Sequence, residues 1–291
     1  MKDTPINFIL IGFMIFQLFS CQSNSSSELK EALTFFASFD NGTTADFAKG
    51  DANIYTADGS YVDGKRKLDG IQTGMHNANH GIIEGKGQFG NAFEFGKEKN
   101  SQVIFYKSKD NISYYPQNWS GSISFWLSVD PATDLEGYTD PIQITDVNYN
   151  DASIWVDFTN DNPPNFRLGA IGDKSAWSQD TLNSPFEVEF EKRLVTIKQP
   201  PFSRSTWTHV LVTFKELGTS NSLASLYLNG EKQGVVSGID DPFTWNLEES
   251  NIYLGLGFTG LMDDLSIFNK PLTDDQAKEL YQLKEGIKSI L

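Results

Sequence analysis

The stretch that decides the fold lies near the C-terminus, where Gly260 to Tyr281 reads GLMDDLSIFNKPLTDDQAKELY. Leu265 and Ile267 alternate with polar residues as in a half-buried β-strand, and this parity predicts that Asp263, rather than Asp264, faces the core. A carboxylate on a core face costs free energy unless a partner compensates it. The stretch therefore predicts a strand with a buried aspartate that needs a partner.

The same stretch continues through an Asn-Lys-Pro turn into a helix. Thr273 followed by Gln276 has the spacing of a capping box, in which each side chain bonds to the other residue's backbone N–H. Leu280 and Tyr281 lie where a helix would pack against a neighbouring layer. We expect a short C-terminal helix that closes the fold and ends near Gly286.

Upstream, strand patterns recur between turn residues along most of the chain. In Gly121–Val129, Ile123 and Leu127 share one face and Trp126 lies on the other, while Asn229–Gly230 is a strong hairpin motif. No amphipathic helix separates the strands, which excludes parallel βαβ units and predicts an all-β fold, a two-sheet antiparallel jelly-roll sandwich. The expected strands are Thr34–Phe39, Asn91–Phe95, Gln102–Phe105, Gly121–Val129, Pro141–Thr145, Ser153–Phe158, Asn165–Ile171, Glu187–Ile197, Thr208–Phe214, Ala224–Leu228, Gln233–Val236, Asn251–Leu254 and Leu261–Phe268.

Several longer strings carry a family resemblance. They are FASFDNG (Phe36–Gly42), GQFGNAFEFG (Gly87–Gly96), GSISFWLSVDP (Gly121–Pro131), WTHVLVTF with LYLNGE (Trp207–Phe214 and Leu226–Glu231), and IYLGLG with GLMDDLSIFNKPLT (Ile252–Thr273). In this order they resemble laminin-G-like domains of the concanavalin A-like lectin/glucanase superfamily, over about Leu33 to Leu283. That superfamily contains lectins, enzymes and adhesion modules, so the resemblance implies a fold more than a ligand.

The resemblance also implies a structural calcium ion. In similar domains, aspartates at the end of the first strand and on the closing strand, here Asp40 and Asp263, hold the ion together with backbone carbonyls. Asp46 and Asp51 in the opening loop would add oxygens toward the roughly six to eight that calcium takes. The alternative is that Asp263 accepts hydrogen bonds from backbone N–H groups of the opening loop without a metal.

The N-terminus has the pattern of a targeting segment. Lys2 precedes the apolar run Phe8–Phe16, which is too short to span a bilayer comfortably. Leu18–Cys21 resembles a bacterial lipoprotein signal, which implies acylation of Cys21, the only cysteine of the chain; an ordinary secretory signal is the alternative. We expect a signal peptide (1–21), a polar tether (22–32) and one domain (33–291) that is lipid-anchored on the cell envelope and faces the periplasm or the cell exterior.

The charge balance limits the partners. Asp and Glu number 38 against 23 Lys and Arg, giving a net charge of -15. A nucleic acid is excluded as a partner, because its phosphates need Lys and Arg. Strongly anionic polysaccharides are disfavoured unless a basic patch or a cation mediates. Acidic loops also suit calcium.

Residues Phe47–Gly87 form a long segment rich in Gly and Asp, with a basic run at Lys65–Lys67. Two interpretations stay open: an ordered loop that carries binding groups, or a β-hairpin that covers a sheet edge. His76 and His80 lie four residues apart, but Gly and Asn around them favour a loop over a zinc-binding helix. We keep both histidines as candidate ligand-binding residues.

The alternation EVEFE invites an enzymatic interpretation. On a strand, Glu187, Glu189 and Glu191 would share a face, as the catalytic carboxylates do in β-glucanases of the same superfamily. The central residue is Glu rather than Asp, and the flanking residues lack aromatic side chains that would line a glycan cleft. We therefore favour a solvated strand face.

Aromatic side chains in loop-rich segments are candidates for stacking on sugars. They are Tyr149, Trp155, Trp177 and Trp245. The function that we expect is non-enzymatic binding of an extracellular glycan or a cell-surface protein. A glycan hydrolase or lyase of the same fold and a purely structural protein-binding module are the alternatives.

Overall fold

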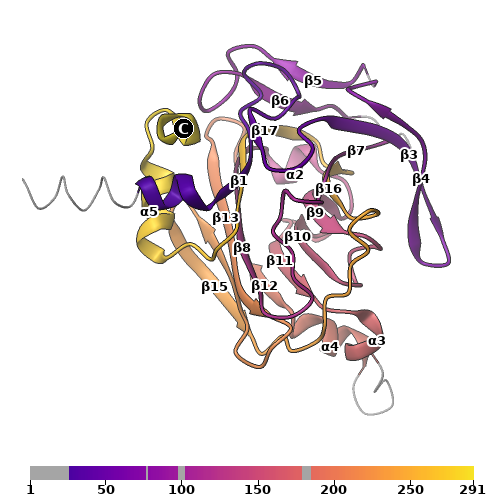
Figure 1. Cartoon of the computed structure of the whole chain (residues 1–291). Helices are drawn as coiled ribbons and strands as arrows, with labels where there is room; N and C mark the ends of the chain where they lie inside the picture. The colour runs from indigo at the N-terminus through magenta and orange to yellow at the C-terminus, as the bar shows by residue number, and fades with distance from the viewer. Residues whose placement is uncertain (1–25, 77, 98–101, 179–184) are drawn as a thin grey trace, which may run out of the picture.

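The computed structural model describes residues 26–76, 78–97, 102–178 and 185–291. Two antiparallel sheets pack face to face and account for most of the domain (Figure 1). The first, sheet A, has the order β15-β14-β13-β8-β17-β1-β2, and β6 pairs with β17 and β5. Its strands are β1 (Leu33–Ala37), β2 (Phe47–Ala48), β5 (His80–Ile83), β6 (Ala92–Phe95), β8 (Trp119–Ser128), β13 (Thr208–Leu217), β14 (Leu223–Leu228), β15 (Glu231–Ser237) and β17 (Gly260–Phe268).

The second, sheet B, has the order β12-β11-β10-β9-β16-β7-β3-β4. Its strands are β3 (Ile54–Val62), β4 (Lys65–Thr73), β7 (Gln102–Lys107), β9 (Thr139–Thr145), β10 (Ser153–Phe158), β11 (Phe166–Ile171), β12 (Leu194–Ile197) and β16 (Asn251–Leu256). The helices are short: α2 (Pro131–Asp134), α3 (Lys174–Trp177), α4 (Phe186–Glu191), α5 (Asp274–Gln282) and the 3₁₀ helix η1 (Gly286–Ile290). None of the helices in the described residues is long and apolar enough to cross a membrane.

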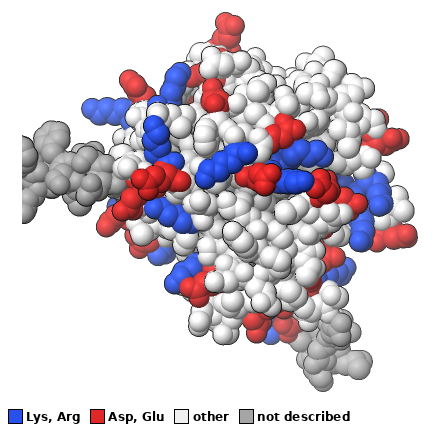
Figure 2. Space-filling model, in the orientation of Figure 1, with Lys and Arg blue, Asp and Glu red and all other residues white. Residues whose placement is uncertain are grey.

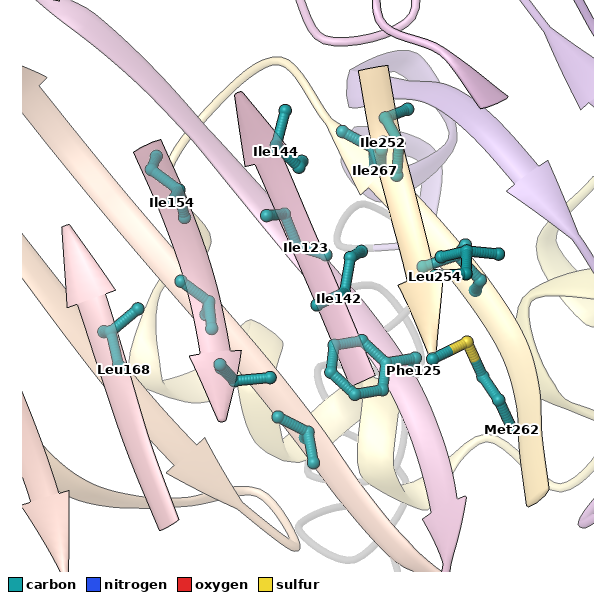
Figure 3. Close-up of a cluster of buried hydrophobic side chains, with 14 of the residues drawn as sticks. Ile123, Phe125, Ile142, Ile144, Ile154, Leu168, Ile252, Leu254, Met262 and Ile267 are labelled. Carbon is teal, nitrogen blue, oxygen red and sulfur yellow. The ribbon is translucent and has the colours of Figure 1, made fainter. Parts of the chain in front are cut away.

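The core lies between the two sheets. Ile123, Phe125 and Ile267 of sheet A face Ile142 and Ile154 of sheet B (Figure 3), and each of them is at most 1% exposed. The predicted alternation in β8 therefore holds. The two-sheet sandwich with a short C-terminal helix confirms the predicted fold class.

The β14–β15 hairpin and helix α5 begin and turn where the sequence predicts. Asn229 and Gly230 have φ of 50° and 76° and join β14 to β15, as a two-residue hairpin turn requires. The capping box of Thr273 and Gln276 is present in both directions. Helix α5 ends at Gln282, slightly before the predicted stop.

The outer face of sheet A is covered by the two ends of the described chain. Residues 26–32 are helical, and Leu29 of this segment packs with Phe36 of β1, Leu280 of α5 and Ile287 of η1. The expected tether (22–32) is corrected accordingly: its C-terminal part is docked on the domain, because Leu29 and Ala32 bury apolar surface there.

The segment Phe47–Gly87 forms strands rather than a long loop. Strands β3 and β4 make a hairpin along the edge of sheet B, where β3 pairs with β7. Strand β5 pairs with β6 in sheet A. Of the two interpretations of this segment, the hairpin at a sheet edge is the one that the structure shows.

Charged side chains are interspersed on the surface. On the face shown in Figure 2, Lys and Arg alternate with Asp and Glu along a band across the middle, and the area below it is largely uncharged. No broad basic patch appears on this face.

Candidate functional site

Polar side chains lie on the outer face of sheet B. Along β9, β10 and β11 they alternate with apolar side chains that point into the core. Gln143 of β9 lies between Ile142 and Ile144, whose side chains are in the core. Asp157 of β10 and Arg167 of β11 alternate with core residues in the same way. Because side chains alternate along a strand, these three polar groups share the outer face.

One pocket opens over this face, and a second lies beside it where β7, β9 and β16 end near β5 of sheet A. The Tyr149 pocket has a volume of about 580 Å³ and the His80 pocket about 520 Å³, each within the roughly 300–1,000 Å³ range of small-molecule sites. They share Tyr61, Arg66, Tyr138 and Leu256 and so lie side by side, and the two together are called the groove below. The Tyr149 pocket is also lined by Asp140, Gln143, Tyr149, Trp155, Asp157, Arg167, Phe186, Glu187, Phe190 and Glu191, and the His80 pocket by Gly59, His80, Lys97, Gln102, Val103, Ile104, Asp134, Glu136, Leu254, Gly255, Gly257, Phe258 and Thr259.

Three exposed tyrosines border the groove. Tyr61 on the β3–β4 hairpin, Tyr138 just before β9 and Tyr149 after β9 are 56%, 63% and 46% exposed. Large aromatic rings that stay exposed beside a pocket offer flat apolar faces to a ligand. The hairpin and the loops of sheet B therefore place the accessible rings around a polar floor.

A chain of hydrogen bonds crosses that floor. Arg66 Nη2 donates to the Tyr61 hydroxyl at 2.6 Å and to Gln143 Oε1 at 3.4 Å, and Gln143 Nε2 donates to Asp140 Oδ2 at 2.6 Å. The Arg66 guanidinium also lies over the rings of Tyr61 and Tyr253, 4.9 and 4.8 Å from their centroids. These contacts fix the orientation of the Gln143 amide.

Next to this chain, Asp157 and Arg167 form an ion pair. Arg167 Nε donates to Asp157 Oδ1 at 2.9 Å, and Nη2 donates to Oδ2. The guanidinium lies 5.3 Å from the Tyr138 ring centroid and 5.5 Å from that of Trp155, within reach of a cation–π interaction. Burial raises the pKa of Asp157 despite the arginine.

Asp140 is the titratable group that burial affects most in this pocket. Burial and the neighbouring Asp157 carboxylate hold the pKa of Asp140 well above its usual range, although Arg66, Arg167 and the Gln143 hydrogen bond act in the opposite direction. Loss of solvation disfavours the charged form of a carboxylate. The floor thus contains the Asp157 carboxylate, which is paired with Arg167, and the Asp140 carboxylate, whose loss of solvation is only partly offset by its neighbours.

The structure brings some of the expected ligand-binding residues together and leaves others apart. Tyr149 and Trp155 line one pocket and His80 the other. Trp155 is only 1% exposed beneath Phe190, so it forms floor rather than an open stacking surface.

The other three candidates lie away from the groove lining. Trp177 packs under α4 in a small apolar cluster, and Trp245 is buried against Trp119. His76 contacts the Thr73 carbonyl oxygen through Nε2 at 2.9 Å.

The predicted strand Glu187–Ile197 is wrong over its first half. Residues Phe186–Glu191 form helix α4, and β12 begins at Leu194. Glu187, Glu189 and Glu191 therefore do not alternate on a strand. Glu187 and Glu191, four apart on a helix, line the Tyr149 pocket, whereas Glu189 pairs with Lys192. Contrary to expectation, aromatic side chains do surround these glutamates, because Phe186 and Phe190 come from the same helix.

The parity prediction for Asp263 is also wrong. Met262 and Leu265 both lie in the core, which requires an extra residue between them, and the pairing of β17 with β8 shifts register after Asp263. Asp263 is opposite Trp126, on the outer side of sheet A. Asp264, with φ of 55°, is buried as well, at 4% exposed. This β-bulge places two adjacent carboxylates out of solvent.

The four aspartates expected around calcium have separate hydrogen-bond partners. Asp40 Oδ1 accepts from Asn91 N at 2.9 Å, and Asp263 Oδ2 accepts from Phe89 N at 2.9 Å. Asp46 accepts from Ser38 N and the Asn41 side chain. Asp51 accepts from Tyr55 and from both the backbone and side chain of Asn53.

The fit to calcium is therefore partial. Asp40 and Asp263 hold the same loop, and Asp263 Oδ1 is buried with no hydrogen-bond partner among the described residues, as an oxygen awaiting a cation would be. Among the same residues, however, no group of three His, Cys, Asp or Glu side chains is arranged to hold a metal. Calcium stays a prediction, with backbone carbonyls needed to complete its coordination.

Cys21 and the signal segment lie outside the described residues. The groove residues that sequence reasoning missed are Tyr61, Arg66, Tyr138, Asp140, Gln143, Asp157 and Arg167. The available signal was a polar or charged residue in the middle of an apolar strand, as in WVDF and FRLG. Such residues are costly to bury without partners, which marks them for attention.

Comparison with known proteins identifies the same fold. A laminin G family model, described as the concanavalin A-like lectin/glucanases superfamily, matches residues 106–278. No curated protein is similar enough in sequence to match the chain.

Solved structures are similar in fold at low sequence identity. Domain 4 of AbnA, a GH43 extracellular arabinanase from Geobacillus stearothermophilus in complex with arabinotriose, has 17% identity and a TM-score of 0.53, covering 86% of this chain and 98% of that domain. The botulinum neurotoxin serotype D binding domain has 13% identity and a TM-score of 0.56, covering 89% and 52%. The binding domain of botulinum neurotoxin DC in complex with SialylT has 11% identity and a TM-score of 0.50, covering 91% and 52%. The chain thus spans about half the length of the neurotoxin domains, and these likenesses concern the fold alone.

Proposed function

Because this chain belongs to the concanavalin A-like lectin/glucanases superfamily, we propose that the groove on sheet B binds an extracellular glycan without cleaving it. The observation that carries the proposal is the placement of Tyr61, Tyr138 and Tyr149 around a floor of hydrogen-bonding groups. Sugars present apolar ring faces and many hydroxyl groups, and this combination of surfaces matches both. Two proteins of similar fold were solved with the glycans arabinotriose and SialylT, which supports the ligand class.

The groove also suits an extended ligand. Its two pockets meet at Tyr61, Arg66 and Tyr138, so a chain of sugars can pass from one pocket to the other over these residues. We therefore propose an oligosaccharide or a stretch of polysaccharide as the ligand.

A glycan array with tyrosine variants tests the proposal. Tyr61→Ala and Tyr138→Ala should each weaken binding of the best array ligand by about tenfold, the loss expected for one aromatic contact of ~1–1.5 kcal/mol. Tyr115→Ala is the matched control, since Tyr115 is 66% exposed and does not line either pocket. Absence of any glycan ligand, with specific capture of one cell-surface protein instead, would favour the protein-binding module.

One observation favours an enzyme as a second candidate. The Tyr149 pocket holds Asp140, whose raised pKa suits a proton donor, together with Glu187 and Glu191, and glycoside hydrolysis uses an acid and a second carboxylate. Incubation with β-glucans, arabinan and alginate should release no reducing ends or unsaturated products if the domain only binds. If products appear, Glu187→Gln or Glu191→Gln should abolish them and Glu189→Gln should not.

We further propose that a lipid on Cys21 anchors the domain. Four residues separate Cys21 from Ser26, which span at most about 18 Å, and Ser26 bonds to Glu279 of α5 at 2.8 Å. Helix α5 lies on the outer face of sheet A, on the side of the sandwich away from sheet B (Figure 1). An anchored domain would therefore present its groove away from the membrane.

A further inference from the structure

The charges around the Tyr149 pocket do not balance. Its described lining carries four carboxylates, those of Asp140, Asp157, Glu187 and Glu191, against the guanidinium groups of Arg66 and Arg167. Arg167 is committed to both oxygens of Asp157. Arg66 donates to Tyr61 and Gln143 and forms no ion pair with a described carboxylate. The pocket therefore has an excess of negative charge, which disfavours ligands that bear carboxylate or sulfate groups.

Asp140 is the least compensated of these carboxylates on the floor. Its Oδ2 accepts one hydrogen bond, from Gln143 Nε2 at 2.6 Å, and its Oδ1 accepts none from the residues that the structure describes. The Gln143 amide cannot turn to supply a second donor, because its Oε1 accepts from Arg66. Burial is the main reason that the pKa of Asp140 is raised, and the Asp157 carboxylate adds to it, because the single hydrogen bond from Gln143 and the charges of Arg66 and Arg167 offset these effects only in part.

We propose that Asp140 receives a protonated amino group of the ligand, so that the groove prefers an amino sugar to a neutral or an acidic sugar. This inference rests on the proposed glycan-binding function. An ammonium group carries three donors and a positive charge, and its hydrogen bond to a carboxylate is about twice as strong as one between neutral groups. A metal ion is a poorer occupant, since the described residues contain no group of three metal-ligating side chains.

Protein NMR titration of the purified domain with amino sugars and with their parent sugars measures this preference. Glucosamine, galactosamine and mannosamine are each compared with glucose, galactose and mannose. The best amino sugar should bind about tenfold more tightly than its parent sugar, as an added charge-assisted hydrogen bond predicts. Asp140→Asn should bring the two affinities within about twofold of each other. The exposed Asp240→Asn, outside the pocket lining, is the matched control and should keep the preference.

Acidic sugars and an amine without a sugar serve as further test ligands. Glucuronate and galacturonate should bind more weakly than glucose and galactose to the unmodified domain, a result that does not depend on any variant. Equal affinity for amino and parent sugars, or a preference that persists in Asp140→Asn, would overturn the inference and leave glycan binding intact. Equally tight binding of Nα-acetyl-lysine amide would overturn it too, by showing that the pocket takes an amine without a sugar. Absence of binding by every sugar, together with an empty glycan array, would overturn the proposed function as well.

Discussion

Arg167 and Asp157 face each other across the β10–β11 pair, with Arg167 Nε 2.9 Å from Asp157 Oδ1 on the outer face of sheet B. Their side chains are only 16% and 6% exposed. A buried ion pair gains little net stability over apolar side chains of the same shape, but it fixes the position of both partners. The pair therefore holds the Arg167 guanidinium beside Tyr138 and Trp155 and gives the pocket floor one defined shape.

We predict that Arg167→Met destabilises the domain by about 3–5 kcal/mol, because it leaves the buried Asp157 carboxylate without its partner. The double variant Arg167→Met with Asp157→Leu should recover most of that loss, since no unpaired charge remains. Urea unfolding of the two variants measures both effects. Lys109→Met, which breaks the exposed pair with Glu248, is the control and should change little. A single variant as stable as the unmodified domain would mean that Asp157 is already compensated by other groups.

A second prediction concerns pH. Burial, together with repulsion from Asp40, raises the pKa of Asp263 to about 7. Burial, together with repulsion from Asp263, Asp40 and Asp46, raises the pKa of Asp264 to about 8. Unfolded aspartates titrate near ~3.9, so between about pH 4 and pH 8 the folded state binds more protons than the unfolded state. In chelator, stability should therefore fall as the pH rises through this window, by at most ~1.4 kcal/mol per pH unit for each group.

Asp264→Asn should make that pH dependence shallower. Asparagine tolerates the left-handed backbone at this position, and its side-chain oxygen can still accept the hydrogen bond from Ile287 N. Asp63→Asn is the matched control, because Asp63 also has a positive φ, 51°, but is exposed in a turn. Unfolding midpoints measured at several pH values test this prediction. If stability changes with pH equally steeply in the unmodified domain and in Asp264→Asn, then Asp264 does not contribute to the pH dependence.

Calcium would reverse this behaviour. A cation beside Asp40 and Asp263 favours their ionised forms, so calcium should stabilise the domain most at high pH. At a thousandfold excess over Kd the gain is about 4 kcal/mol, and chelation should lower the melting temperature by several degrees. Asp263→Asn should abolish the calcium effect, whereas Asp63→Asn should preserve it, since Asp63 is exposed in the turn between β3 and β4 and is not one of the four expected ligands. If chelator does not change the melting temperature, Asp263 serves only as an acceptor of backbone hydrogen bonds.

The fold could be read from the sequence because local and tertiary preferences agree in most strands. Ser153–Phe158 was predicted and found as β10 without a shift, since its alternating side chains serve both the core and the outer face. Disagreement arises where packing overrides the local pattern. In EVEFE the glutamates alternate as in a strand, but Phe186 and Phe190 are four residues apart and pack on Trp177 from one side of a helix.

The groove was harder to predict, because its walls come from segments far apart in sequence. Tyr61 reaches the groove only because β3 pairs with β7 and brings the hairpin along the edge of sheet B. Tyr149 was identified as an aromatic residue in a loop, whereas Tyr138 has no comparable motif around it. Asp263 illustrates the other difficulty. One extra residue in β17 moves each side chain that precedes it in the strand to the opposite face of the sheet, and no turn residue in the sequence marks that bulge.

The last prediction concerns the anchor and the direction in which the groove faces. Cys21→Ser should release the protein from membranes, because it removes the single thiol that could carry a lipid; Ser23→Ala, which keeps Cys21, should stay bound. Acylated protein reconstituted in vesicles should bind its best glycan as tightly as the released Cys21→Ser protein, since Ser26 and the groove lie on opposite faces of the sandwich. Membrane fractionation, mass spectrometry of the N-terminal peptide and glycan titration measure the three effects. A Cys21→Ser protein that remains membrane-bound while the unmodified chain carries no acyl mass would refute the anchor, and a vesicle-bound domain that loses glycan affinity would refute the outward-facing groove.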